Sequence, residues 1–131
     1  MVSLPERTRK DVSARRDALN EADVAILCLP DEAARDAVSL VDPASSVAVV
    51  DASTAFRTAP GWVYGFPELC PGQRAKIAAS KRVSNPGCYA TGFLAAVRPL
   101  VDAELLPVNA ALTCHAVSGY TGGGKVRELT P

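Results

Sequence analysis

The residues whose types and spacing could do chemistry lie around Cys88, where a polar turn meets an apolar helical pattern. The turn is Ser84-Asn85-Pro86-Gly87. It interrupts any strand or helix, because Pro86 lacks an N–H and Gly87 tolerates positive φ. Cys88 is therefore expected in the first turn of a helix. The free N–H groups and the helix dipole there stabilise a thiolate and can lower a cysteine pKa below its ordinary value of about 8.5.

Two interpretations of Cys88 are equally compatible with these neighbours. As a nucleophile, its thiolate would attack a carbonyl carbon, and the same N–H groups would hold the oxyanion of a thiohemiacetal or an acyl thioester. As a structural residue, it would be a small buried hydrophobe at a turn. The residues next to Cys88 do not distinguish the two interpretations, so evidence from the rest of the sequence is needed.

The other three cysteines lack such surroundings. Cys28 and Cys114 lie in apolar runs typical of packed strands, and Cys70 lies in a loop rich in proline and glycine. None of the four forms a CxxC or CxH pair, and their spacing is too irregular for a zinc site or a disulfide framework. Free thiols and no metal are expected, and stoichiometric zinc in the purified protein would revive a metal site.

The elements that must position Cys88 begin with a predicted βαβ unit. Residues 23–29 and 46–51 are continuous apolar runs, typical of strands buried on both faces of a parallel sheet. Between them, Asp31 is expected to cap a helix that runs to about Val41. The predicted fold class is α/β, with a partial doubly wound, Rossmann-like parallel sheet.

Polar residues follow both predicted strands, where ligands gather in this class of fold. Pro30 and Asp31 come after the first strand. Ser53, Thr54 and Arg57 come after the second, and they present two hydroxyls and a guanidinium at its end.

The remaining segments alternate between regular and irregular patterns. An exposed helix is predicted at 9–20, a short helix at 73–80, and a longer helix from Cys88 to about Ala103. Residues 57–72 are predicted to form an ordered loop, because three aromatic residues accompany its prolines and glycines. Residues 110–117 alternate like a strand, and a glycine-rich loop follows from Ser118 to Lys125. This loop is not a Walker A motif, because Val126 occupies the position that requires Ser or Thr. Its sequence is equally compatible with a loop that contacts a ligand and with a plain turn.

The composition excludes several classes of function. The 131 residues carry no formal net charge, which argues against nucleic-acid and membrane-surface partners. No apolar run approaches the roughly 18 residues of a membrane span, and the chain begins without a signal-peptide pattern. A cytoplasmic protein is expected, with a core that its 48% apolar content can build.

Four ordered motifs resemble N-acetyl-gamma-glutamyl-phosphate reductase, most closely its shorter bacterial type. They are Asp-Ala-Ser-Thr-Ala-Phe-Arg at 51–57, Tyr-Gly-Phe-Pro-Glu-Leu at 64–69, Ser-Asn-Pro-Gly-Cys-Tyr-Ala-Thr-Gly at 84–92, and Ala-Val-Ser-Gly-Tyr-Thr-Gly-Gly-Gly-Lys at 116–125. The resemblance implies NADPH-dependent reduction of N-acetyl-gamma-glutamyl phosphate to N-acetylglutamate 5-semialdehyde and phosphate, in arginine biosynthesis. A complete enzyme of this kind is expected to be a homo-oligomer.

The resemblance also implies roles for single residues. Cys88 matches the family's catalytic cysteine, and Arg57 matches the arginine that helps to hold the substrate phosphate in the wider superfamily. Asn85 and Glu68 are implied as further substrate-binding residues. The residues implied for binding NADP are Pro30, Ser53, Ser118, Gly119 and Lys125.

The chain departs from the family pattern at both ends. Nothing before Asp23 matches the glycine-rich first βα unit, and the family's catalytic histidine lies beyond the glycine-rich loop. Residues 1–84 are therefore expected to be a partial NADP-binding domain, and 85–131 the start of an α+β catalytic and dimerisation domain. His115 is expected to be a structural or strand-end histidine. Alone, the chain is expected to be nearly inactive and to leave sheet edges unpaired.

Two alternatives remain at this point. One is a related reductase that acts on an aspartyl or aminoadipyl phosphate, and the other is a noncatalytic α/β fragment that acts as a binding or assembly partner. The residues that choose NADP over NAD are expected in or just after the unmatched first unit.

Overall fold

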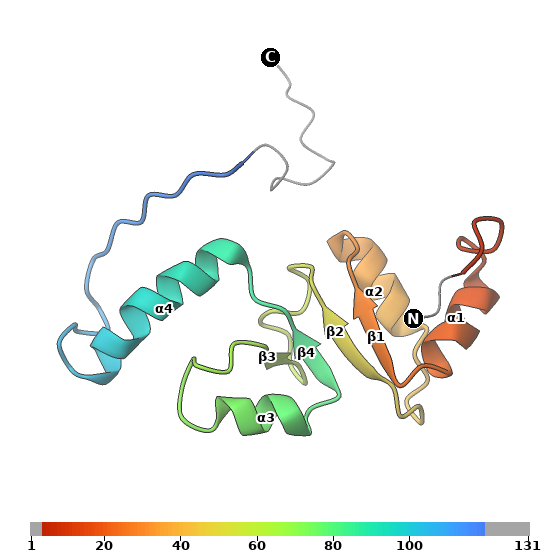
Figure 1. Ribbon diagram of the computed structural model, residues 1–131, viewed down its shortest axis with the longest axis horizontal. Coiled ribbons are helices and arrows are strands. Elements are labelled where there is room, and N and C mark those ends of the chain that lie inside the picture. The colour runs from red at the N-terminus through yellow and green to blue at the C-terminus, as the bar shows by residue number, and fades with distance from the viewer. Residues whose placement is uncertain (1–3, 120–131) are drawn as a thin grey trace, which may run out of the picture.

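The computed structural model describes residues 4–119, in which a parallel sheet is linked by helical crossovers (Figure 1). The strands are β1 (Val24–Leu27), β2 (Ala48–Asp51), β3 (Val63–Tyr64) and β4 (Arg82–Ser84), in the spatial order β1-β2-β4-β3. Helix α2 (Asp31–Ser39) connects β1 to β2, and α3 (Gln73–Ala79) connects β3 to β4. Helix α1 (Val12–Asn20) precedes the sheet and α4 (Cys88–Asp102) follows it. The predicted α/β fold with a Rossmann-like parallel sheet is confirmed.

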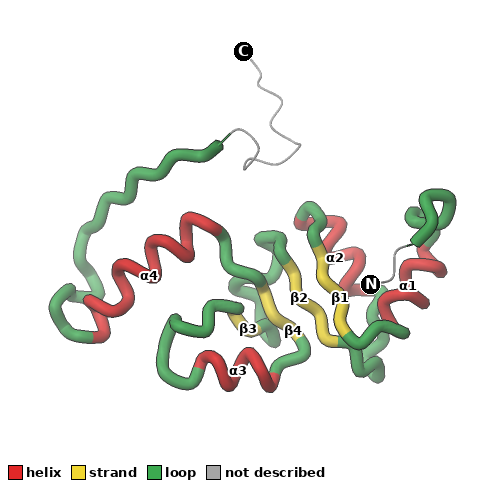
Figure 2. Tube along the Cα trace, viewed as in Figure 1, coloured by secondary structure: helices red, strands yellow, loops and turns green. Residues whose placement is uncertain are grey.

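The strand register brings the carboxyl ends of all four strands to one level. Leu27 lies opposite Asp51, Asp51 opposite Ser84, and Tyr64 opposite Ser84. The chain leaves β1, β2 and β4 at this one edge, and β4 leads directly into α4 (Figure 2). Residues far apart in the sequence can therefore meet there.

The core lies between the sheet and its crossovers. Small and branched side chains form the main cluster: Ala25, Leu27, Ala37, Val41, Val47 and Val49. In a second cluster, the ring of Phe56 stacks on Trp62 with centroids 4.1 Å apart and planes 13° from parallel. This stacking holds Trp62, one of the three aromatic residues of the 57–72 loop, against the core. The loop also contains β3, which could not be predicted from the sequence because a two-residue strand is too short to show a recognisable period.

Strand β1 corrects the expectation of burial on both faces. Ala25 and Leu27 are buried, whereas Val24 and Ile26 are 56% and 71% exposed. Within residues 4–119, β1 pairs with β2 alone, and a hollow of about 840 Å³ runs between β1 and α1. The expectation of an unpaired sheet edge is confirmed for this part of the chain.

The segment after α4 corrects a second expectation. Residues 110–117 are not a strand, because alternation alone cannot satisfy backbone groups and no described strand pairs with this segment. It runs as a loop back along α4, with Val117 95% exposed (Figure 2).

The three predicted helices outside the βαβ unit are confirmed, with α1 starting three residues later than expected and α4 ending one residue earlier. None of the helices in residues 4–119 has the length and apolar character needed to cross a membrane.

Candidate active site

Cys88 is the first residue of α4, as its sequence neighbours predicted, and its side chain is exposed. Gly87 is the N-cap and provides no side-chain hydrogen bond. The first helical hydrogen bond runs from the Thr91 N–H to the Gly87 carbonyl oxygen, at 2.9 Å. Helix geometry leaves the N–H groups before Thr91 without a helical acceptor. The thiol therefore stands at a cluster of backbone donors.

Gly87 contributes to this turn in a different way from the one expected. Its φ is −76°, so the turn does not use positive φ. Instead, a Cβ at this position would lie 2.6 Å from Nη1 of Arg57 and 3.1 Å from its Cζ. Glycine thus allows the Arg57 guanidinium to pack against the backbone directly before Cys88. The Arg57 guanidinium and the start of α4 therefore lie on either side of Gly87.

Asp51, the last residue of β2, connects the two turns that form this arrangement. It is fully buried, and its Oδ2 accepts hydrogen bonds from the N–H and the hydroxyl of Ser53, at 3.1 and 2.6 Å. Ser53 Oγ in turn accepts the Ala55 N–H at 3.1 Å. The carbonyl oxygen of Asp51 accepts the Asn85 N–H at 2.6 Å. Asp51 is not among the site residues predicted from the sequence, although a carboxylate that ends an apolar strand is a signal that could have identified it.

Two buried polar atoms at this edge have no hydrogen-bond partner among the described residues. They are Oδ1 of Asp51 and Nε of Arg57, an acceptor and a donor. Buried polar atoms are nearly always bonded in native proteins. Both atoms therefore offer hydrogen-bonding capacity next to the Cys88 turn.

Asp31 does not cap α2, which corrects the expected role of its side chain. Pro30 is the N-cap, and the Asp31 carboxylate accepts the N–H of Thr54 at 2.9 Å and also its hydroxyl. The hydrogen bonds from Thr54 lower the pKa of Asp31, and the positive charges of Arg35 and Arg57 lower it further. Asp31 thereby joins the start of α2 to the turn after β2.

The other predicted site residues lie in different surroundings, and not all of them are close to the Cys88 turn. Pro30 is exposed at the end of β1, and the Asn85 side chain is exposed beside Pro86. The hydroxyl of Ser53 is already engaged by Asp51 and Ala55. Glu68 forms a surface ion pair with Arg74, at 2.8 Å, and no contact brings it to the Cys88 turn in the described part of the chain.

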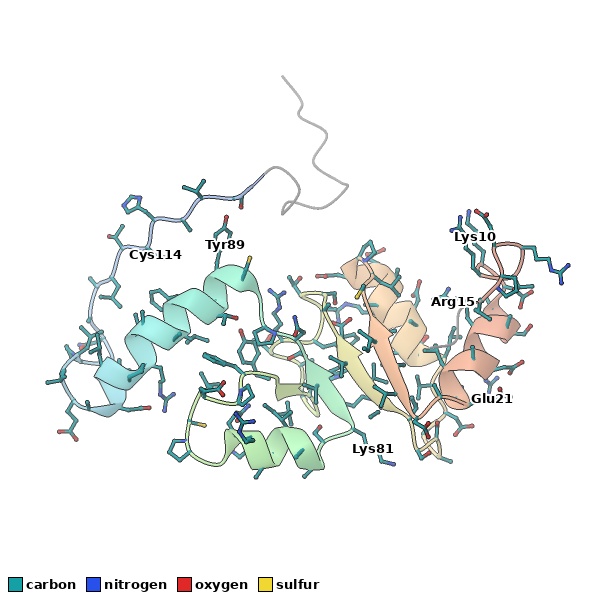
Figure 3. All side chains as sticks on the ribbon, in the orientation of Figure 1. Lys10, Arg15, Glu21, Lys81, Tyr89 and Cys114 are labelled. Carbon is teal, nitrogen blue, oxygen red and sulfur yellow. The ribbon has the colours of Figure 1, made fainter. Side chains whose placement is uncertain are left out.

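The glycine-rich loop is described only at its start. The hydroxyls of Ser118 and Tyr89 are hydrogen-bonded, and Tyr89 points from the start of α4 toward the segment that carries Cys114 (Figure 3). Gly119 is exposed, and Lys125 lies outside the described residues. Ser118 is thus connected to the residue that follows Cys88.

His115 and the remaining cysteines correct three smaller expectations. His115 is exposed in irregular backbone and is not in a strand. Cys28 and Cys114 are exposed rather than packed, because the surfaces around them are uncovered within residues 4–119, and Cys70 is half-buried. All four cysteines are free. Within residues 4–119, no group of three His, Cys, Asp or Glu side chains is arranged to hold a metal ion.

Two protein-family models match consecutive parts of the chain. The model of the semialdehyde dehydrogenase NAD binding domain matches residues 3–78. The model of the semialdehyde dehydrogenase dimerisation domain matches residues 88–130. No solved structure matches the chain significantly.

Curated relatives match nearly the whole chain. It is 62% identical over 125 residues to N-acetyl-gamma-glutamyl-phosphate reductase 2 of Nostoc sp., which is 95% of this chain and 38% of that protein. It is 57% identical to N-acetyl-gamma-glutamyl-phosphate reductase 2 of Pseudomonas putida and 54% identical to N-acetyl-gamma-glutamyl-phosphate reductase of Brucella ovis, with 95% of this chain and 40% of each relative covered. The chain therefore spans about two fifths of the length of these relatives.

Proposed function

The chain belongs to the semialdehyde dehydrogenase family, and on that basis we propose that it carries the nucleophile of an NADP-dependent N-acetyl-gamma-glutamyl-phosphate reductase. One observation carries the proposal: the Arg57 guanidinium packs against Gly87, directly before Cys88 at the start of α4. The names of the relatives from Nostoc, Pseudomonas and Brucella support the choice of substrate.

In the proposed reaction, the Cys88 thiolate attacks the carbonyl carbon of the acyl phosphate. A C–S bond forms, and the carbonyl oxygen becomes an oxyanion that the N–H groups at the start of α4 can hold. The C–O bond to the phosphate then breaks, and phosphate leaves with the electron pair while a thioester remains on Cys88. Arg57 would bind the phosphate oxygens before and during this step, since a guanidinium offers two parallel donors.

A nicotinamide cofactor fits the carboxyl edge of the sheet. Dinucleotides bind at this edge in doubly wound folds, and the chain after β1 is exposed there, including Leu29 and Pro30. When bound, the cofactor supplies the hydride that reduces the thioester to the aldehyde. We assign its binding to Pro30, Ser53, Ser118, Gly119 and Lys125, and Ser53 would act through its backbone because its hydroxyl is engaged.

Further parts of the proposal rest on the family and on sequence position. Asn85 is exposed next to the Cys88 turn and is assigned to substrate binding. Glu68 is also assigned to substrate binding, on the family resemblance alone. A division into a partial cofactor-binding domain (1–84) and the start of a catalytic and dimerisation domain (85–131) is supported by the two model matches, as is a homo-oligomer. The expected cytoplasmic location belongs to the same proposal.

A chimera tests the proposed function. In it, this chain replaces the matching segment of the Nostoc relative, and the unmodified relative is the control. NADPH absorbance is followed with N-acetylglutamate 5-semialdehyde, phosphate and NADP as reactants. We expect the chimera to form NADPH, and this chain alone to form little or none.

A folded chimera without activity would contradict the proposal. Aspartate semialdehyde in place of the N-acetylglutamate derivative tests the related reductase, and NAD in place of NADP tests the cofactor. Inactivity with every pair would favour a noncatalytic role for the chain.

A further inference from the structure

We propose that Asp51 is a positioning residue that sets the Arg57 guanidinium against the turn carrying Cys88. The inference rests on the proposed roles of Arg57 and Cys88. Asp51 would touch neither the thiol nor a substrate, and it would act through the turn after β2.

The carboxylate of Asp51 organises that turn from a buried position. Asp51 is 0% exposed and Ser53 is 8% exposed, so water cannot replace their hydrogen bonds. Oδ2 of Asp51 accepts both Ser53 donors, and Ser53 Oγ accepts the Ala55 N–H. This series of hydrogen bonds fixes the backbone up to two residues before Arg57. Loss of a buried partner is costly because the remaining groups stay desolvated.

The main chain of Asp51 fixes the opposite side of the arrangement. Its carbonyl oxygen accepts the Asn85 N–H at 2.6 Å, three residues before Cys88. Any residue at position 51 can make this backbone bond, whereas the bonds to Ser53 require a side-chain acceptor. Removing the carboxylate should therefore release Arg57 and leave the start of α4 in place.

The rate of alkylation of Cys88 by two reagents reports the position of Arg57. Iodoacetate is an anion and iodoacetamide is neutral, so a cation beside Cys88 favours iodoacetate. The cation therefore raises the alkylation ratio, which is the rate constant with iodoacetate divided by the rate constant with iodoacetamide. The ratio is measured on the full chain by mass spectrometry of the peptide that contains Cys88. Arg57→Ala should lower the ratio roughly fivefold, the size expected in bulk water for one unit charge at about 4 Å.

Asp51→Ala should lower the same ratio by a similar factor. Asp51→Asn keeps an acceptor oxygen for Ser53 and should restore part of the ratio. Loss of negative charge alone would raise the ratio, because it favours the anionic reagent. The direction of the change therefore separates positioning from a simple charge effect.

Asp42→Ala is the matched control. Asp42 also accepts a backbone N–H two residues ahead, from Ala44 at 2.8 Å, but it is exposed and precedes β2. We expect it to leave the ratio unchanged. Circular dichroism of each variant checks the fold.

A folded Asp51→Ala protein with an unchanged or raised ratio overturns the inference, provided that Arg57→Ala lowers it. An unchanged ratio in Arg57→Ala overturns the placement of Arg57 and, with it, both the inference and that part of the proposed function. If Asp51→Ala does not fold, Ser53→Ala decides, because it removes the hydroxyl between Asp51 and Ala55. A folded Ser53→Ala protein with a normal ratio contradicts the inference, and a lowered ratio supports it.

Discussion

Cys88→Ser should lower the turnover number of the active chimera by on the order of 10³-fold or more, because a serine hydroxyl is hardly ionised near neutral pH. Serine is close to cysteine in size, and Cys88 is exposed, so the fold should be retained. The measurement is kcat for NADPH formation, with thermal unfolding followed in parallel. Since the nucleophile is lost, KM should change far less than kcat.

Cys114→Ser is the matched control for this variant. Cys114 is also an exposed free thiol, and it follows α4 in the chain. Its replacement should leave kcat close to that of the chimera. A Cys88→Ser protein that keeps most of its kcat would rule out covalent catalysis at this position.

Arg57→Ala should lower kcat/KM for the acyl phosphate roughly 10- to 100-fold, the range for a lost hydrogen bond to a charged group. The reason is that the guanidinium next to Gly87 would no longer meet the phosphate. Arg57→Lys should recover only part of the loss, because an ammonium keeps the charge without the planar pair of donors. In the reverse assay, the main change should be a higher KM for inorganic phosphate.

Arg35→Ala separates the position of Arg57 from the net charge of the region. Arg35 also lowers the pKa of Asp31, and its guanidinium lies over the Phe56 ring, 5.6 Å from the centroid. Its removal should leave the KM for phosphate unchanged. Equal effects of the two substitutions would show that Arg57 acts through general charge rather than through contact with phosphate.

Strands β1 and β2 and the start of α4 could be predicted from the sequence because each has a strong local signal. The apolar runs before Pro30 and before Asp51 predicted β1 and β2, and the Pro86-Gly87 turn predicted the start of α4 at Cys88. Strands β3 and β4 have two and three residues, too few to show a period. The alternating run at 110–117 shows the opposite failure, since a strand also needs a neighbour and none is described there.

The candidate site was predicted as a set of residues rather than as an arrangement. The position of Arg57 and of Ser53 after β2 followed from the general rule for strand ends. The contact of Arg57 with Gly87 joins residues thirty positions apart, and nothing local to Gly87 indicates it. In the same way, the hydrogen bond from the Asn85 N–H to the Asp51 carbonyl oxygen depends on the alignment of β2 with β4, which a single sequence does not specify.

The most direct test of the account is to trap the acyl group on the enzyme. The chimera is mixed with N-acetyl-gamma-glutamyl phosphate in the absence of a nicotinamide cofactor, quenched in acid and digested for mass spectrometry. We predict the mass of one N-acetylglutamyl group on the peptide that contains Cys88, its removal by hydroxylamine, and its absence from Cys88→Ser. An acyl group on another residue, or an unmodified Cys88 in a chimera that turns over its substrate, would contradict the account.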